Sequence, residues 1–335
     1  MKQILVTGGA GFIGSNFVRL IARERPDWRV VVLDKLTYAG RMENLEGLDV
    51  KFVQGDICDP KAVAEAMEGC SWVFNFAAET HVDRSLIEGA EHAGSFIQTN
   101  TYGVYVLLEE AKRRGVQRFL HVSTDEVYGD VHHGHSVETD ALLPRSPYAA
   151  SKAGGELIAR SYFVSHDLPV VITRGSNNFG PYQFPEKLMP LFITNAMDDL
   201  PLPLYGDGLQ QRDFIYAEDH CRGILMCAEK GEPGEAYNIG GGNEHTNREI
   251  TYGILGLLNK PESLIKHVAD RPGHDRRYSL NCDKISALGW RPQHSFEDAF
   301  RTTVMWYRNH EAWWRPIKSG EDYQAYYRKN YGHRA

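Results

Sequence analysis

The chain has 335 residues, of which 42% are hydrophobic and 24% are charged, and its formal net charge is −7. This is ordinary globular composition. Lysine and arginine do not run together in long blocks, which argues against nucleic acid or an anionic membrane as the main partner. No apolar run approaches the roughly 20 residues of a spanning helix, and we expect no signal peptide. The five cysteines form no Cys-x-x-Cys pair, which is typical of reduced thiols in a cytoplasmic protein, and we predict no metal site.

Short apolar segments alternate with segments of helical apolar spacing through the first half of the chain. The predicted strands are residues 3–7, 29–34, 50–54, 72–76, 118–123 and 169–173. Continuous β-branched runs such as Val30-Val31-Val32 suit strands that are buried on both faces of a parallel sheet. Helices are predicted at 12–25, 104–114 and 148–166. Strands that alternate with helices indicate a Rossmann-type, doubly wound parallel α/β sheet.

The pattern changes after about residue 175, where prolines break the chain into short pieces. We therefore expect a first domain at 1–175 that binds the cofactor and carries the catalytic residues. Residues 176–335 would form a smaller lobe that binds substrate, with some segments returning to the first domain.

A glycine-rich loop, Thr7-Gly-Gly-Ala-Gly-Phe-Ile-Gly14, follows the first strand and opens the first helix. Glycines permit a tight turn and let backbone N–H groups approach a pyrophosphate at the helix N-terminus. Asp34 follows Gly14 by 20 residues, where a carboxylate can accept from ribose hydroxyls and disfavour a 2′-phosphate. The loop thus predicts a dinucleotide site that prefers NAD, although a glycine turn in an ordinary α/β sheet is the alternative. Asp56 and Ile57, after the third strand, could flank the adenine.

Tyr148 and Lys152 share one face of the helix predicted at 148–166. A free phenol has a pKa near 10, and both a nearby ammonium and the cationic nicotinamide of NAD+ favour the phenolate. We expect such a phenolate to take the proton of a substrate hydroxyl as a hydride leaves.

Two adjacent acids, Asp125 and Glu126, follow Thr124 at the end of the fifth predicted strand. Open α/β sheets bind their ligands at this edge. Two carboxyls in a confined site rarely both ionise, so one can donate a proton while the other acts as a base. Elimination of water beside a carbonyl needs that division of labour. A solvated loop is the alternative.

The form Thr-Gly-x-x-Gly-x-x-Gly, together with Tyr148 and Lys152, resembles the extended short-chain dehydrogenase/reductase family, over nearly the entire chain. Segments 77–85, 174–178, 180–187, 212–213 and 270–274 are similar, within that family, to the dTDP-glucose 4,6-dehydratases. The resemblance implies a lyase that converts dTDP-glucose to dTDP-4-keto-6-deoxyglucose through oxidation at C4, loss of water across C5–C6 and reduction at C6. Gly175 and Phe179 depart from the pattern, which affects only details of the pocket.

The resemblance also implies roles for individual residues. Tyr148 would be the base at the C4 hydroxyl, Asp125 the acid for the C6 hydroxyl and Glu126 the base at C5. Thr124 would hold the sugar, and Lys152 would complete the catalytic set. The implied NAD site is Gly8, Gly11, Phe12, Ile13, Gly14, Asp34, Lys35, Thr37, Asp56, Ile57, Ala77, Ala78, Thr99, Tyr148, Lys152 and Asn178. The implied substrate site is Thr80, Thr124, Asp125, Glu126, Asn177, Lys187, Leu188, Pro203, Tyr205, Arg212, Asn247, Asp270, Arg271, His274 and Tyr278.

Three alternatives remain open: a UDP-sugar 4-epimerase, a sugar-nucleotide decarboxylase or net oxidoreductase of the same fold, and a catalytically silent nucleotide-binding regulator. An epimerase would not need the acid pair, and a silent regulator should have lost Tyr148, Lys152 or the acids. The nucleotide base is not fixed by the sequence. The resemblance further implies a homodimer that pairs through the helices at 104–114 and 148–165.

Overall fold

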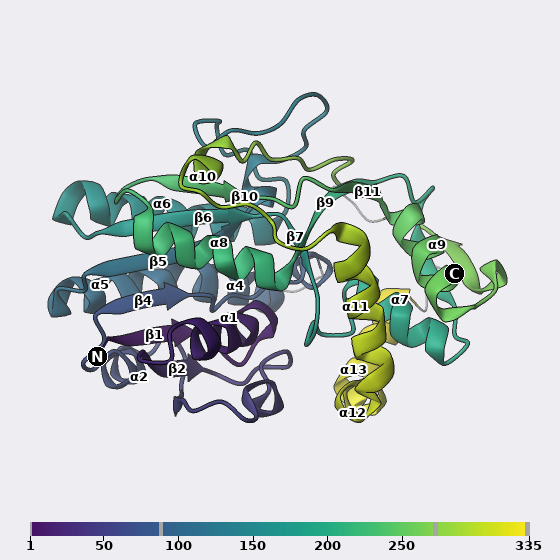
Figure 1. The fold of residues 1–335 in the computed structure, drawn as a ribbon, viewed down its shortest axis with the longest axis horizontal. Helices are drawn as coiled ribbons and strands as arrows, with labels where there is room; N and C mark the ends of the chain where they lie inside the picture. Colours follow the sequence, from purple (N-terminus) through teal and green to yellow (C-terminus); the bar gives the residue numbers. More distant parts are fainter. Residues whose placement is uncertain (1, 87–89, 271–273, 332–335) are drawn as a thin grey trace.

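The computed structural model describes residues 2–86, 90–270 and 274–331 (Figure 1). Seven of the described strands form one sheet in the order β10-β6-β5-β4-β1-β2-β3, and every pairing in it is parallel. The bounds of these strands are β1 Gln3–Thr7, β2 Arg29–Asp34, β3 Lys51–Gln54, β4 Trp72–Asn75, β5 Arg118–Thr124, β6 Val170–Gly175 and β10 Ala236–Ile239. The predicted doubly wound parallel sheet is confirmed, and strand ends differ from the predicted ones by two residues at most.

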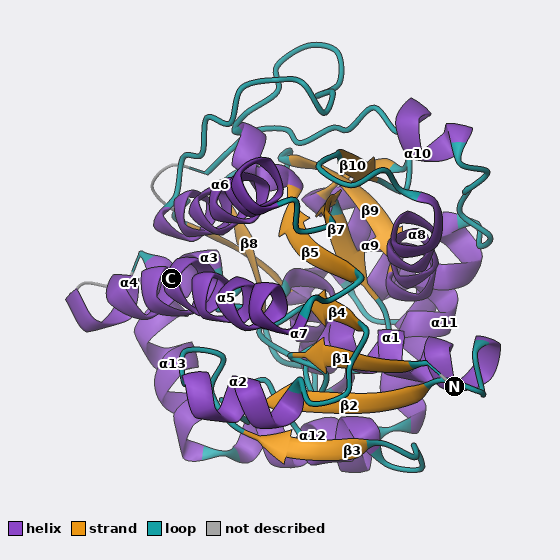
Figure 2. Ribbon diagram, turned by 90° about the vertical axis from the view of Figure 1, so that its left-hand side faces the viewer, coloured by secondary structure: helices purple, strands orange, loops and turns teal. Residues whose placement is uncertain are grey.

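Helices cover both faces of this sheet (Figure 2). Side chains alternate along β1, so that Ile4 and Val6 pack on one face and Leu5 on the other. The first face is covered by α1 (Phe12–Glu24) and α8 (Ala217–Lys230). The second is covered by α2 (Pro60–Ala66), α5 (Val104–Arg114) and α6 (Pro147–His166). Two apolar cores therefore hold the sheet between helices.

A second group of elements lies beyond the ends of β1, β4 and β5, at the right of Figure 1. Its own core contains Phe192, Ile254, Val304 and Trp314. The group contains two small sheets, β11-β9-β7 and β12-β8, and several helices. Their bounds are β7 Asn177–Phe179, α7 Leu188–Met197, β8 Leu202–Tyr205, β9 Gln211–Tyr216, β11 Glu244–Thr246, α9 Asn247–Leu258, β12 Ile265–Val268, α11 Phe296–Asn309, α12 Glu311–Ser319 and α13 Glu321–Tyr331.

Chain order and spatial grouping do not coincide, because α8, β10 and the short helix α10 (Asp283–Ala287) pack on the first sheet although they follow residue 175. The remaining elements are short. They are the helices α3 Val82–Ser85 and α4 Ala90–Ile97, the π-helix at Gln98–Gly103, and 3-10 turns at Met42–Leu45, Asp125–Tyr128 and Glu262–Leu264. No helix in the described ranges is long and apolar enough to cross a membrane.

Candidate active site

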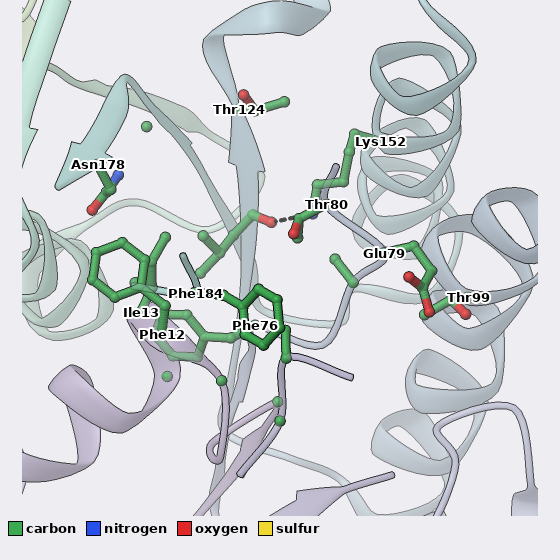
Figure 3. A pocket seen from close by; sticks show the side chains of 18 of the residues that line it. Phe12, Ile13, Phe76, Glu79, Thr80, Thr99, Thr124, Lys152, Asn178 and Phe184 are labelled. Carbon is green, nitrogen blue, oxygen red and sulfur yellow. Dashed lines mark hydrogen bonds between the residues drawn. The ribbon is translucent and has the colours of Figure 1, made fainter. Parts of the chain in front are cut away.

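A pocket opens at the carboxyl ends of β1, β2, β4 and β5, where the strand order reverses between β1 and β4. This switch point is where open α/β sheets bind their ligands. Predicted residues that line the pocket are Gly8, Gly11, Phe12, Ile13, Gly14, Asp34, Lys35, Thr37, Asp56, Ile57, Ala78, Thr80, Thr99, Thr124, Asp125, Glu126, Tyr148, Lys152, Asn177, Asn178 and Lys187. Figure 3 labels ten of the lining residues, including Phe12 and Ile13 below and Thr124 and Lys152 above. One cavity thus joins both predicted sites.

The glycine loop is packed too tightly for side chains at two of its positions. Gly8 has a φ of +68°, and a Cβ there would lie 2.7 Å from the backbone nitrogen of Ala77. A Cβ on Gly14 would lie 2.2 Å from the carbonyl oxygen of Gly8. Because the glycine loop packs this closely, α1 begins directly at the pocket. The N–H groups of its first turn lie beside the glycines. Ala77 itself does not line the cavity; it supports the loop from behind.

Asp34 ends β2 inside the pocket, and its carboxylate organises the loop next to it. Its Oδ2 accepts from the backbone N–H of Ala10 at 2.9 Å, and its Oδ1 accepts from Leu36 at 2.8 Å. Burial raises the pKa of Asp34, and these two backbone hydrogen bonds oppose that shift. Lys35 forms a 2.7 Å ion pair with Asp56, so its charge is neutralised at the pocket edge. Each Asp34 oxygen keeps a lone pair for a ligand hydroxyl.

The acid pair stands where β5 passes into a 3-10 turn. Asp125 is 3% exposed, and Thr124 Oγ1 donates to its Oδ1 at 3.2 Å. Burial, followed by repulsion from Glu126 and Asp213, raises the pKa of Asp125 well above its usual value. The raised pKa favours the protonated carboxyl, and its Oδ2 has no hydrogen-bond partner among the described residues. This arrangement supports Asp125 as a proton donor.

Tyr148 and Lys152 project from the first two turns of α6 and are both buried. Burial and then repulsion from Glu126 raise the pKa of Tyr148, whereas a hydrogen bond with Thr124 acts in the opposite direction. Lys152 Nζ donates to the carbonyl oxygen of Val122 at 2.7 Å, and burial lowers its pKa to about 8. The residues around Tyr148 thus disfavour the phenolate, which is opposite in direction to the expectation from sequence, because burial and repulsion from Glu126 and Asp125 raise the pKa of the phenol.

Eight predicted substrate residues lie outside the cavity lining: Leu188, Pro203, Tyr205, Arg212, Asn247, Asp270, His274 and Tyr278. Several of them contact one another. The Tyr205 and His274 rings meet edge to face at 5.9 Å, and His274 Nδ1 lies 2.6 Å from Asp270 Oδ1. The Arg212 guanidinium lies 4.4 Å from the centre of the Tyr278 ring. The positive charge of Arg212 also lowers the pKa of Asp125, although burial has a larger effect in the opposite direction. Arg212 therefore lies near enough to act on the acid pair. Arg271 lies outside the described residues.

The cavity also contains residues that the sequence did not suggest, among them Glu79, Ser123, Gln183, Phe184, Glu186 and His220. Ser123 lies near the end of β5, His220 lies on the buried face of α8, and the others lie in loops. His220 Nδ1 lies 2.9 Å from Asn178 Oδ1, and burial lowers the pKa of His220 to about 3. Its Nε2 would be 2.5 Å from a Cβ at position 175, so Gly175 makes the space for the imidazole.

Buried polar atoms without a partner gather in this cavity, as the pocket of a polar ligand requires. Within the described part of the chain they include Ser123 Oγ, Asp125 Oδ2, Asn177 Oδ1, Gln183 Oε1 and His220 Nε2. With the glycine turn and the Asp34 lone pairs, these atoms fit a large ligand that carries phosphate, hydroxyl and amide groups. No cluster of three or more potential metal ligands occurs in the described ranges.

Comparison with known proteins gives one consistent family. A family model described as GDP-mannose 4,6 dehydratase matches residues 5–303. The dTDP-glucose 4,6-dehydratase of Streptomyces antibioticus is 49% identical over 323 residues, which are 94% of this chain and 95% of that protein.

Two solved structures allow the alternatives to be compared. The crystal structure of DesIV, a dTDP-glucose 4,6-dehydratase from Streptomyces venezuelae with NAD and TYD bound, has 51% identity and a TM-score of 0.91, covering 94% of this chain and 100% of that one. The UDP-glucose 4-epimerase of Thermus thermophilus in complex with NAD has 33% identity and a TM-score of 0.85, covering 92% and 99%. The chain therefore belongs to the GDP-mannose 4,6 dehydratase family, in which its sequence is more similar to these dTDP-glucose 4,6-dehydratases than to this epimerase.

Proposed function

We propose that the protein is an NAD-dependent lyase that dehydrates dTDP-glucose to dTDP-4-keto-6-deoxyglucose. The observation that carries this proposal is the acid pair, buried Asp125 and partly buried Glu126, in the same cavity as Tyr148 and Lys152. Oxidation at C4 alone would need only Tyr148 and Lys152. Two further carboxyls, one of them with a strongly raised pKa, supply what elimination of water needs. The similarity to dTDP-glucose 4,6-dehydratases supports the same function.

Bound NAD supplies a reversible hydride acceptor, and its cationic nicotinamide favours the Tyr148 phenolate. The glycine loop and Asp34 would hold the pyrophosphate and the adenosine ribose. Lys152, one turn of α6 after Tyr148, donates to the Val122 carbonyl oxygen, and its ammonium would stabilise negative charge on the phenol.

Each catalytic side chain has one proton to move. Tyr148 takes the proton of the C4 hydroxyl, and the resulting ketone acidifies the C5 hydrogen. Glu126 removes that hydrogen as a proton, while Asp125 gives its own proton to the departing C6 hydroxyl. Thr124, which is hydrogen-bonded to Asp125, keeps the acid in place.

The sugar nucleotide would extend from the acid pair towards Arg212, Tyr205 and His274. Arg212 and Lys187 are the cations suited to the diphosphate. Lys187 Nζ donates to the carbonyl oxygen of Thr80 at 2.9 Å, so Lys187 lies beside another predicted substrate residue. Arg271 and the other predicted substrate residues complete this proposal.

One experiment decides among the candidate reactions. Purified protein is given dTDP-glucose with deuterium at C4, without added NAD, and the product is identified by mass and NMR. We expect the mass of one water to be lost and the deuterium to appear in the C6 methyl group. A 4-epimerase would keep the label at C4, a decarboxylase would lose a carbon, and unchanged substrate would indicate a silent regulator. Deuterium in the solvent would overturn the proposal. Parallel incubation with UDP-glucose tests the nucleotide base.

A homodimer is part of the proposal. Large apolar side chains are exposed on neighbouring helices that pack together at one side of the sheet: Ile97, Tyr102, Tyr105, Leu157 and Val164. Grouped exposure of this kind favours a subunit contact between α5 and α6 and their copies.

We also propose that the chain forms two domains, residues 1–175 and residues 176–335. Three elements of the second, α8, β10 and α10, pack on the sheet of the first. The five cysteines are all unpaired, which supports a cytoplasmic location.

A further inference from the structure

An ion pair joins the partly buried Arg84 of α3 to Glu186, a buried residue of the pocket lining. Arg84 Nε and Nη2 both lie 3.0 Å from Glu186 Oε2. The Glu186 side chain is 1% exposed, although it lines the cavity. A carboxylate at such a place is stable only when its lone pairs are satisfied. Arg84 therefore fixes the position of Glu186.

The other oxygen of the Glu186 carboxylate is bound by Tyr38, in the loop after β2. Tyr38 Oη donates to Glu186 Oε1 at 2.8 Å. Burial and the Glu186 charge raise the pKa of Tyr38, so the phenol keeps the proton that it donates. Tyr38 also meets Phe184 edge to face at 5.2 Å, and both neighbours of Tyr38, Thr37 and Ala39, line the cavity.

Two aromatic rings enclose the Arg84 guanidinium. Its Cζ lies 3.9 Å from the centre of the Tyr38 ring and 4.3 Å from that of Tyr326. Tyr326 belongs to α13, and its Oη lies 3.2 Å from His81 Nε2. Arginine stacks on aromatic faces in this way while keeping its fork free for a carboxylate.

The four residues come from four distant parts of the chain: the loop after β2, helix α3, the loop before α7, and α13. Two of these parts face the predicted ligands directly. Thr37 and Ala39 follow Asp34 along the cavity wall, and Glu186 and Lys187 line the cavity close to Thr80. Figure 3 shows Phe184, from the same loop as Glu186, beside Phe12 and Ile13. Glu186 and Phe184 both contact Tyr38, so the two loops are joined at this point.

We propose that Arg84, Tyr38 and Glu186 form a clasp that fastens the loop at 183–187 to the loop at 37–39 and so closes the pocket over NAD and the sugar nucleotide together. Arg84 and Tyr38 are positioning residues that act through Glu186. Loss of either loosens both binding sites and leaves the chemical step nearly unchanged. This inference rests on the proposed function for the identity of the two ligands.

The test uses full-length protein loaded with NAD and three variants. Tyr38→Phe removes one hydroxyl, and Arg84→Lys keeps the charge but loses the planar fork. Tyr326→Phe is the matched control, because it removes a buried hydroxyl of the same cluster and keeps the ring over Arg84. The rate of NAD release is measured by chase with labelled NAD, and KM and kcat are measured with dTDP-glucose.

We expect Tyr38→Phe and Arg84→Lys each to raise the release rate and the KM by about tenfold to hundredfold, as for loss of a hydrogen bond to a charged group. The kcat should stay within about twofold, since none of the proton-transferring residues is touched. Tyr326→Phe should match the wild type. Equal release and equal KM in Tyr38→Phe and Tyr326→Phe would overturn the clasp, and this comparison decides even where Arg84→Lys lowers the melting temperature. NAD release needs no turnover, so a wild-type protein that retains NAD without dehydrating dTDP-glucose would refute the proposed function alone.

Discussion

Asp125→Asn separates oxidation from elimination. Asparagine has almost the same shape as the protonated carboxyl, and its amide can donate at the place of Oδ2, which has no partner among the described residues. The variant therefore loses only the transferable proton. General acid catalysis contributes about 10²- to 10⁴-fold, which corresponds to roughly 3–5 kcal/mol of activation free energy. Loss of water should slow by this factor, and oxidation at C4 should persist because Tyr148 and Lys152 are unchanged.

The assay follows both steps in one reaction. Stopped-flow absorbance of the reduced nicotinamide reports oxidation at C4, and quenched samples analysed by mass report loss of water. We expect the reduced form to accumulate in Asp125→Asn, whereas Tyr148→Phe should prevent its formation. An Asp125→Asn protein that eliminates water at the wild-type rate, or that loses both steps equally, would refute the assignment of Asp125 as the acid.

The same substitution has a consequence for stability. The pKa of Asp125 is raised well above its value in the unfolded chain, so its contribution to stability is complete below the unfolded-state pKa and is lost as pH rises through the folded-state pKa. Asparagine does not ionise, so its burial costs no additional free energy as pH rises. Asp125→Asn should therefore gain stability relative to the wild type as pH rises from the unfolded-state pKa towards the raised folded-state pKa, measured by thermal melting. A relative loss over this range would contradict the buried, protonated state.

Three further outcomes follow from the geometry. Gly14→Ala should empty the dinucleotide site, because its Cβ would lie 2.2 Å from the Gly8 carbonyl oxygen; NAD released from denatured protein measures this, and full retention would contradict it. Activity should fall as pH rises through about 8, where Lys152 loses its charge, and an unchanged rate well above that pH would show that the ammonium is not needed. Leu157→Glu should convert a dimer to monomers in light scattering, whereas Leu143→Glu, at a more exposed site, should not; equal effects would exclude the helix contact.

The strands and the glycine loop could be predicted because their signals are local. A buried parallel strand is a short apolar run, and a dinucleotide turn needs glycine at fixed spacing. Tyr148 and Lys152 are likewise one helical turn apart. Each of these patterns is complete within a few residues of sequence, so no knowledge of distant contacts is required.

Other parts of the site depend on contacts between distant segments. Glu186 and His220 enter the cavity through a loop and through a helix face that reads as ordinary core. The direction of the Tyr148 pKa shift could not be predicted either, because it depends on how deeply the phenol is buried and how near Glu126 lies. Sequence spacing gives neither the burial nor the distance.

The late position of β10 in the sequence leaves an edge of the seven-stranded sheet unpaired while the chain is being synthesised. β10 pairs with β6 but follows it by some sixty residues. A nascent chain that has left the ribosome as far as Gly175 presents the outer backbone edge of β6 without its neighbour. Exposed strand edges template association with other chains. During synthesis the chain is therefore prone to association through the exposed edge of β6. This exposure ends when Ile239 has emerged and β10 can pair with β6.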